Sequence, residues 1–270
     1  MIARIDDAAD PRLAPYAMVA DPAALARAGL FAAEGRLVAP RLIASAYRVH
    51  SLLVSDSALE RLRPVLETRP DIDVLVAPAG IISAAGGYDF HRGCLALGYR
   101  GAPRELAELL EPGAGSLHSL VVLEGVSNPD NIGGLFRSAH AFAARGVILA
   151  AGCGDPLYRK AIRTSMGATL DVPWAAANEW PADLGLLTSR GYRVIAMTTD
   201  AGAPPLRDAI AHLDRPAALL FGSEGYGLSR DALAAADVQA RIPMPNAGAD
   251  SLNVVSAASI ALYEARPRVR

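Results

Sequence analysis

The sequence predicts an α/β protein whose C-terminal part is a parallel sheet covered by helices on both faces. The first supporting observation is a set of strands that are apolar along both faces, as strands buried on two sides are. The second is their regular alternation with helical segments from residue 120 onward, which is typical of parallel sheets. A third is that polar loops follow three of these strands. A smaller α/β part precedes this sheet.

Composition places the chain among globular proteins. It has 270 residues, of which 52% are hydrophobic and 20% charged, enough for one large or two ordinary domains. The net charge of −2 gives no whole-molecule positive field of the kind many nucleic-acid-binding proteins show. Two distant cysteines, Cys94 and Cys153, indicate neither a disulfide framework nor a metal site. With an acidic start and no apolar run of membrane length, we expect a cytoplasmic protein without a membrane segment.

The N-terminal part alternates helices and strands at short range. Helical patterns cover residues 23–28, 37–46 and 59–66, and strand patterns cover 51–54, 73–76 and 94–97. Proline and glycine are then frequent between Gly101 and Ser119, which is typical of a connection between domains. The expected organisation is a first domain over 1–105, a linker over 106–118 and a second domain over 119–270.

The C-terminal part contains the elements of the predicted parallel sheet. Strands are expected at residues 120–126, 147–150, 192–197, 217–221 and 239–242. Helices are expected at 135–144, 157–166, 183–189, 229–236 and 252–265. The last helix has scarcely a polar face and many small side chains, so it must be buried on most sides and can approach another backbone closely.

Three polar loops carry the functional information. They read Asn128-Pro129-Asp130-Asn131-Ile132-Gly133-Gly134, then Gly222-Ser223-Glu224-Gly225-Tyr226-Gly227, then Ile242-Pro243-Met244 running on to Ser251-Leu252-Asn253. Ligands of open α/β sheets bind outside the carboxyl ends of the strands, so three such loops predict one composite site. The first loop lacks the G-x-G-x-x-G spacing of dinucleotide folds. This weakens the case for a nucleotide-binding oxidoreductase, which stays open as the alternative class.

At these loops the chain resembles the SpoU (TrmH-like) family of RNA ribose 2′-O-methyltransferases, within the SPOUT superfamily. The family motifs N-x-x-N-x-G-x-x-x-R, G-x-E-x-x-G and I-P-M followed by S-L-N all occur in order. The resemblance implies transfer of a methyl group from S-adenosylmethionine to a ribose 2′-hydroxyl of structured RNA, with ribosomal RNA favoured over transfer RNA. It also implies a deep trefoil knot in the C-terminal domain and a homodimer formed through that domain.

The N-terminal part has a weaker resemblance to the same family. Phe31-Ala32-Ala33-Glu34-Gly35 and His91-Arg92-Gly93-Cys94-Leu95-Ala96 resemble segments of the small α/β/α domain, related to ribosomal proteins, that precedes the catalytic domain in many members. The resemblance implies that residues 1–105 bind the RNA substrate. An RNA-binding relative without activity is a further alternative, disfavoured because Arg137, Ser251 and Asn253 are present.

The resemblance also assigns roles to single residues. The implied cofactor-binding residues are Thr198, Gly222, Ile242, Met244, Leu252 and Asn253. The implied catalytic residues are Asn131, Arg137, Glu224, Ser251 and Asn253, with Asn131 and Glu224 bracing the loops. Since a guanidinium is very hard to deprotonate, Arg137 is expected to stabilise developing charge rather than act as a base. Ser251 has the alternative of being the N-cap of the last helix.

Overall fold

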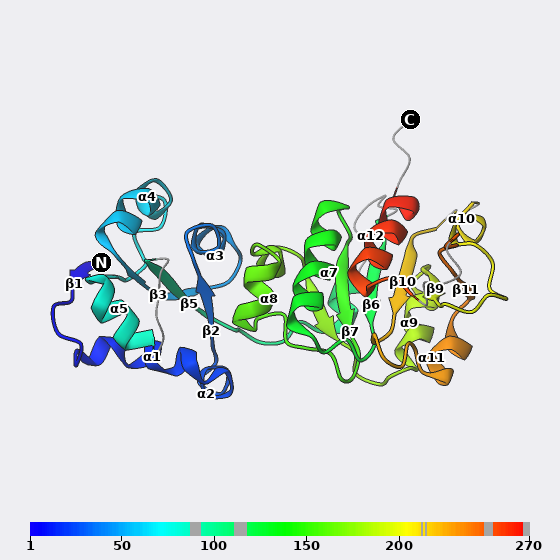
Figure 1. Cartoon of the computed structure of the whole chain (residues 1–270), viewed down its shortest axis with the longest axis horizontal. Coiled ribbons are helices and arrows are strands. Elements are labelled where there is room, and N and C mark those ends of the chain that lie inside the picture. Colours follow the sequence, from blue (N-terminus) through cyan, green and yellow to red (C-terminus); the bar gives the residue numbers. More distant parts are fainter. Residues whose placement is uncertain (87–92, 111–117, 212, 214, 246–250, 267–270) are drawn as a thin grey trace. The chain divides into compact units, whose positions relative to one another are not determined.

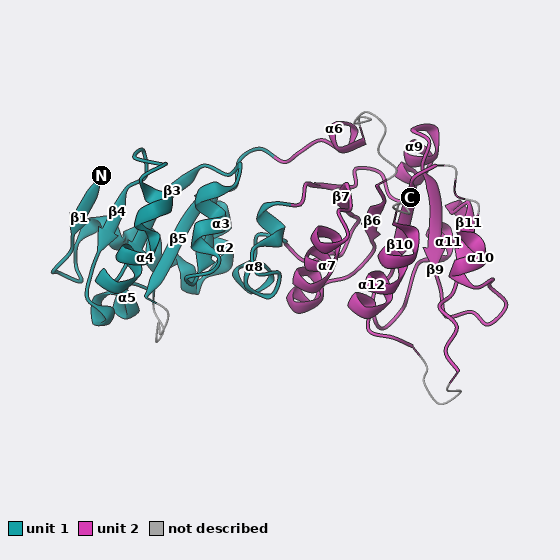
Figure 2. Cartoon of the chain, turned by 90° about the horizontal axis from the view of Figure 1, so that it is seen from above, with its two compact units in different colours: residues 1–102, 156–171 teal, residues 103–155, 172–270 magenta. Residues whose placement is uncertain are grey.

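The computed structural model describes residues 1–270 except 87–92, 111–117, 212, 214, 246–250 and 267–270, and it divides the chain into two units (Figures 1 and 2). Unit 1 consists of residues 1–102 and 156–171, and unit 2 consists of residues 103–155 and 172–270. Of the two N-terminal family segments, His91 and Arg92 lie outside the described residues.

Unit 1 is built on a mixed five-stranded sheet with the order β1-β4-β3-β5-β2. Its strands are β1 (Ile2–Arg4), β2 (Leu30–Glu34), β3 (Val49–Val54), β4 (Val74–Val76) and β5 (Cys94–Tyr99). Strands β1 and β3 run parallel to β4, whereas β5 runs antiparallel to both β3 and β2. The strands β1 and β2 were not predicted, since β1 is only three residues long and β2 has no polar alternation.

Helices lie on both faces of this sheet (Figure 1), in the α/β/α arrangement that the family resemblance implies. They are α1 (Ala14–Ala17), α2 (Pro22–Arg27), α3 (Ala39–Ala44), α4 (Asp56–Leu66) and α5 (Ala79–Gly86), with 3-10 turns at Pro11–Leu13 and Met18–Ala20. The core on one face includes the buried side chains of Tyr16, Leu53 and Leu95. The Tyr16 hydroxyl is satisfied by the Ser51 hydroxyl at 2.7 Å, and burial raises the pKa of this phenol.

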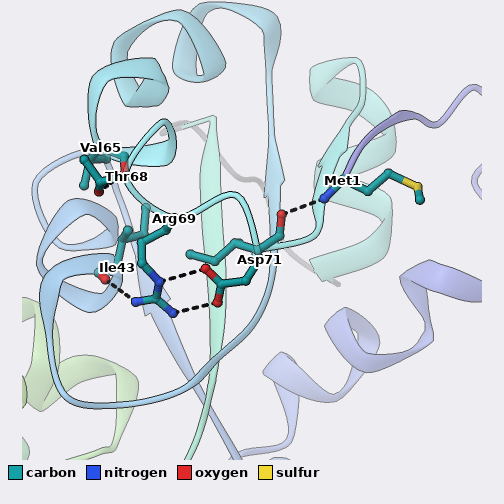
Figure 3. Close-up of polar contacts among 7 residues, drawn as sticks. Met1, Ile43, Val65, Thr68, Arg69 and Asp71 are labelled. Carbon is teal, nitrogen blue, oxygen red and sulfur yellow. Dashed lines mark hydrogen bonds and ion pairs between the residues drawn. The ribbon is translucent and has the colours of Figure 1, made fainter.

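A polar cluster fixes the connection between α4 and β4, as Figure 3 shows. The guanidinium of Arg69 donates to both carboxylate oxygens of Asp71, at 2.9 and 3.0 Å, and to the Ile43 carbonyl at the end of α3, at 2.9 Å. The hydrogen bonds lower the pKa of the Asp71 carboxyl. This fork therefore ties the loop to a neighbouring helix while leaving the carboxylate in solvent.

Unit 2 contains the predicted parallel sheet. Its order is β11-β9-β10-β6-β7-β8, and every pairing is parallel. The strands are β6 (Leu120–Leu123), β7 (Gly146–Leu149), β8 (Trp174–Ala176), β9 (Arg193–Met197), β10 (Ala217–Phe221) and β11 (Val238–Ala240). The predicted strand over 120–126 ends at Leu123 because Gly125 turns the chain with a φ of 68°.

Helices cover both faces of this sheet as well. They are α6 (Leu106–Leu110), α7 (Pro129–Ala141), α9 (Asp183–Ser189), α10 (Leu206–Ala209), α11 (Arg230–Ala235) and α12 (Val254–Ala265). Helices α6, α9 and α11 share one apolar core with alternate strand residues such as Val122, Val194 and Leu220. Helices α7 and α12 pack against each other, α7 on β7 and α12 on β10. The expectation of helices on both faces is confirmed.

Helix α8 (Arg159–Thr164) belongs to unit 1, although it lies between strands β7 and β8 of unit 2 in the sequence. It packs against β2, where Arg159 pairs with the buried Glu34 at 3.4 Å. This division differs from the expected one of 1–105, 106–118 and 119–270. It also differs at α6, which lies in the predicted linker but buries three leucines in unit 2, while 111–117 fall outside the described residues.

Candidate active site

A cleft of about 850 Å³ lies in unit 2, outside the carboxyl ends of β9 and β10 and beside the start of α12. It is lined by the second and third polar loops. Eight of the ten predicted site residues line it: Thr198, Gly222, Glu224, Ile242, Met244, Ser251, Leu252 and Asn253. Asn131 and Arg137 do not, and they lie on helix α7.

The second loop closes on itself directly after β10. The Gly227 amide donates to the Ser223 carbonyl at 2.9 Å, and the Tyr226 amide donates to the Ser223 hydroxyl at 3.3 Å. A Cβ on Gly222 would lie only 2.1 Å from the carbonyl carbon of Gly227. The family resemblance implies that Gly222 binds the cofactor, and a glycine leaves its backbone open to close approach. The backbone that approaches it most closely here is that of the loop itself.

Asn131 connects the three loops through its side chain. Its amide nitrogen donates to the Glu224 carboxylate of the second loop. Its amide oxygen accepts a hydrogen bond of 3.2 Å from the Asn253 side chain of the third loop. Only 9% of Asn131 is exposed, so these bonds satisfy polar groups that are largely withdrawn from water. Residues more than 90 positions apart are thereby held around one cleft.

The start of α12 is fixed by Asn253. Its side-chain oxygen accepts from the Val255 amide at 2.9 Å, so Asn253 is the N-cap of this helix. The alternative role of Ser251 as N-cap is therefore wrong, because the helix begins at Val254 and not at residue 252. Ser251 is exposed and lines the cleft, which leaves its hydroxyl available for the role in the site that the family motif implies.

Residues directly after β9 and β11 form another wall of the cleft. The Thr198 amide donates to the Ala240 carbonyl at 2.9 Å, and the Thr198 hydroxyl accepts from the Asp200 amide at 3.1 Å. The guanidinium of Arg241 donates to the Ala203 carbonyl at 2.9 Å. Glu224 and Arg241 are the charged residues of the lining, and each has a hydrogen-bond partner. The remaining lining is apolar, hydroxyl-bearing or backbone, apart from the side-chain amide of Asn253.

Glu124 binds the helix that follows the second loop. The sequence did not predict a role for it. Its carboxylate, at the end of β6, accepts from the Trp180 indole at 2.6 Å, from the Ser229 amide at 2.7 Å and from the Ser229 hydroxyl at 2.7 Å. Since Ser229 is the N-cap of α11, Glu124 holds the helix that follows the second loop. An acidic residue directly after a buried strand is the signal that marks it.

Two exposed side chains belong to the segments that form this site, Arg137 on the helix of the first loop and Tyr226 in the second loop. Arg137 lies on α7, six residues after Asn131, and so about 240° around the helix axis from it. It has no hydrogen bond or ion pair with another described residue. Tyr226, at the tip of the second loop, is 98% exposed. Sequence reasoning missed Tyr226, although an aromatic residue between two glycines is the signal that indicates it.

Residues 118–263 match the SpoU rRNA Methylase family, and this segment contains all three loops and the cleft. The chain belongs to this family. It is 39% identical over 241 residues to an uncharacterised tRNA/rRNA methyltransferase of Mycobacterium bovis, a match that covers 87% of this chain and 80% of the relative.

Solved structures of RNA methyltransferases extend the similarity to both units. An rRNA methyltransferase from Sinorhizobium meliloti with bound AdoMet is 25% identical, with a TM-score of 0.81 and coverage of 98% of this chain and 97% of that one. An RNA 2′-O ribose methyltransferase is 28% identical, with a TM-score of 0.76 and coverage of 97% and 98%. This SpoU chain is accordingly an RNA methyltransferase with an α/β fold.

Proposed function

We propose that this chain transfers a methyl group from S-adenosylmethionine to a ribose 2′-hydroxyl of RNA. The observation that carries the proposal is the Asn131 side chain, which joins Glu224 and Asn253 and so gathers the family's three motifs around one cleft. Similarity to an RNA 2′-O ribose methyltransferase supports the ribose as acceptor, and similarity to the rRNA methyltransferase from S. meliloti supports ribosomal RNA. We also propose a cytoplasmic location.

The lining of the cleft fits S-adenosylmethionine. Ile242, Met244 and Leu252 supply apolar surface for an adenine ring, while the Thr198 hydroxyl and the loop backbone supply polar contacts. The two charged lining residues, Glu224 and Arg241, each have a hydrogen-bond partner within the protein. The ligand therefore does not have to compensate a buried charge. When bound, this cofactor supplies an electrophilic methyl group to an oxygen nucleophile.

The residues of the chain have separate tasks in the proposed reaction. Ser251 and Asn253, at the entrance to α12, orient the ribose. Arg137 binds an RNA phosphate and stabilises negative charge on the 2′-oxygen as its proton passes to solvent water, because a guanidinium stays charged and presents a fork of donors. Asn131 and Glu224 position the loops without touching the reacting atoms. Tyr226 offers a flat exposed ring to a nucleobase.

We further propose a homodimer through unit 2 and the family's knot in the third loop. The exposed apolar side chains of α12, Ile260 at 39% and Tyr263 at 50%, support a partner surface there. Helix α12 packs on β10 in the middle of the sheet, whereas β11 before it is the edge strand. The chain therefore goes from the edge of the sheet at β11 to its middle at α12, as the proposed knot requires.

Calorimetry with S-adenosylmethionine and with NAD, both in EDTA, tests the cofactor. We expect binding of S-adenosylmethionine in roughly the micromolar range, about −8 kcal/mol, and none of NAD. Binding of NAD alone would replace the methyltransferase with the oxidoreductase alternative.

Among the described residues, no group of three or more His, Cys, Asp and Glu side chains is placed to hold a metal, and no helix there is long and apolar enough to cross a membrane.

A further inference from the structure

A second cleft, of about 1180 Å³, lies entirely within unit 1. Five segments form it: the end of β2 with the chain after it, the first turns of α4, the start of α5, the residue before β5 and the end of α8. The side chains that matter here are Arg36, Leu37, Arg61, Arg163 and Met166, with serine hydroxyls from Ser55, Ser57 and Ser83. Arg163 and Met166 come from the segment that packs against β2, far from the rest in sequence.

The cleft is positively charged. Arg36, Arg61 and Arg163 are all exposed, and none has a hydrogen bond or ion pair from its side chain to another described residue. The acidic residue in the lining is Glu34, which is 8% exposed and paired with Arg159 at 3.4 Å. Three cationic side chains thus face one space in a chain whose net charge is −2, so the positive field is local.

Apolar surface lies beside these charges. Leu37 is 62% exposed and Met166 is 38% exposed, and both line the cleft. Met166 has a φ of 54°, a backbone conformation that residues other than glycine rarely adopt. The turn at the end of α8 holds it there, with the Met166 amide donating to the Arg163 carbonyl at 3.0 Å and the Gly167 amide donating to the Ile162 carbonyl at 2.8 Å.

We propose that this cleft binds an unpaired stretch of the RNA substrate, with phosphates on Arg36, Arg61 and Arg163 and a base against Leu37 and Met166. Guanidinium forks bind phosphates in a bidentate manner, and the serine hydroxyls add neutral donors. A base offers an apolar face to Leu37 and Met166 only when it is not stacked in a duplex. The identity of the ligand as RNA rests on the proposed function.

Fluorescence anisotropy on the full chain tests the charged part of the site. The probe is a labelled RNA strand of about 12 nucleotides and mixed sequence, alone or annealed to its complement. We expect the single strand to bind more tightly. The double variant Arg61→Ala/Arg163→Ala should weaken its binding about tenfold and lower the slope of log affinity against log salt by about 1.4, for two lost phosphate contacts.

Arg63→Ala is the matched control, because Arg63 lies on the same helix α4 but outside the cleft, paired with Glu60 at 2.7 Å. It removes one charge and should leave the affinity within about twofold, as a single exposed ion pair contributes little. Leu37→Ser/Met166→Ser tests the apolar part. It should weaken single-strand binding while the salt slope stays unchanged, since no phosphate contact is lost.

Equal affinity of the wild type and the Arg61→Ala/Arg163→Ala variant for the single strand would overturn the proposal. So would tighter binding of the duplex, or no binding of the single strand by the wild type. Calorimetry with S-adenosylmethionine separates this from the proposed function. Both double variants should bind it as the wild type does, whereas a wild type that binds RNA at this cleft but not S-adenosylmethionine would reject the methyltransferase proposal alone.

Discussion

At the scale of single residues, two glycines of one loop differ in the space around them. A Cβ on Gly222 would lie 2.1 Å from backbone, whereas a Cβ on Gly225 would have no atom within 4 Å. We expect Gly222→Ala to reshape the loop and to weaken S-adenosylmethionine binding by at least about tenfold, or 1.4 kcal/mol. Gly225→Ala should bind like the wild type. Calorimetry on both variants checks this, and equal affinities would refute it.

Asn131 makes two side-chain hydrogen bonds that join the loops, and its removal leaves the Glu224 carboxylate without that donor. Asn131→Ala should cost about 1–3 kcal/mol of stability and weaken cofactor binding. Asn128→Ala is the control, since Asn128 caps α7 through the Asp130 amide at 2.9 Å and makes no side-chain hydrogen bond to the described residues of the other loops. It should cost about 1 kcal/mol of stability and leave binding intact. Thermal unfolding and calorimetry measure both effects.

Burial raises the pKa of the Cys94 thiol to about 12. Because an unfolded thiol titrates near roughly 8.5, the stability that depends on the neutral thiol is complete below that pH and falls as the pH rises toward the folded pKa. Relative to Cys94→Ala, the wild type should lose up to about 1.4 kcal/mol of unfolding free energy per pH unit above roughly pH 9. Denaturant unfolding at several alkaline pH values tests this. A difference that does not change with pH would contradict it.

At the scale of elements, the contact of α7 with α12 depends on a glycine. A Cβ on Gly134 would lie 2.8 Å from a Val255 methyl, and next to it the Ser138 and Ser259 hydroxyls bond at 2.8 Å. Gly134→Ala should therefore destabilise unit 2 by about 1–3 kcal/mol through overpacking. Gly185→Ala in α9, with no atom within 4 Å of the new Cβ, should stabilise by up to about 1 kcal/mol. Equal melting temperatures for these two variants would refute the account.

Elements with a strong pattern were predicted well, and short ones were not. The strand Ala217–Phe221 and the helix Asp183–Ser189 have the predicted bounds, since a long apolar run and a clear helical period define them. Trp174–Ala176 and Leu206–Ala209 were missed because three or four residues carry no period. The last helix was expected to lie close to another element, and it packs on α7, where the Val255 side chain lies against Gly134.

Among the site residues, the motifs identified which segments line the cleft but not how they are joined. Asn131 bonds to Glu224, and Glu124 bonds to Ser229 at the start of α11. These contacts join residues about 100 positions apart, and a local sequence pattern does not predict them. The place of Arg137 is a similar case. The motif fixes its position in the sequence, whereas its place outside the cleft lining follows from the helix that carries it.

At the scale of the whole molecule, the connection between the two units contributes to the core of unit 2. Leu106, Leu109 and Leu110 of α6 are each less than 5% exposed, and the Leu109 carbonyl accepts from Arg145 at 3.0 Å. A fragment that starts at residue 114 lacks them and should be less stable than one that starts at residue 103, by roughly 5–9 kcal/mol as an upper estimate. Denaturant unfolding of the two fragments decides it, and equal midpoints would show that α6 is dispensable.

The central claim is that this SpoU chain methylates a ribose 2′-hydroxyl, with Arg137 stabilising the developing charge. The most direct test incubates the full chain with labelled S-adenosylmethionine and RNA from a strain that lacks the protein, and then identifies the labelled nucleoside by mass spectrometry. We predict a 2′-O-methyl nucleoside, formed roughly 100- to 1,000-fold more slowly by Arg137→Ala. A label on a base, or an Arg137→Ala rate equal to that of the wild type, would contradict the account.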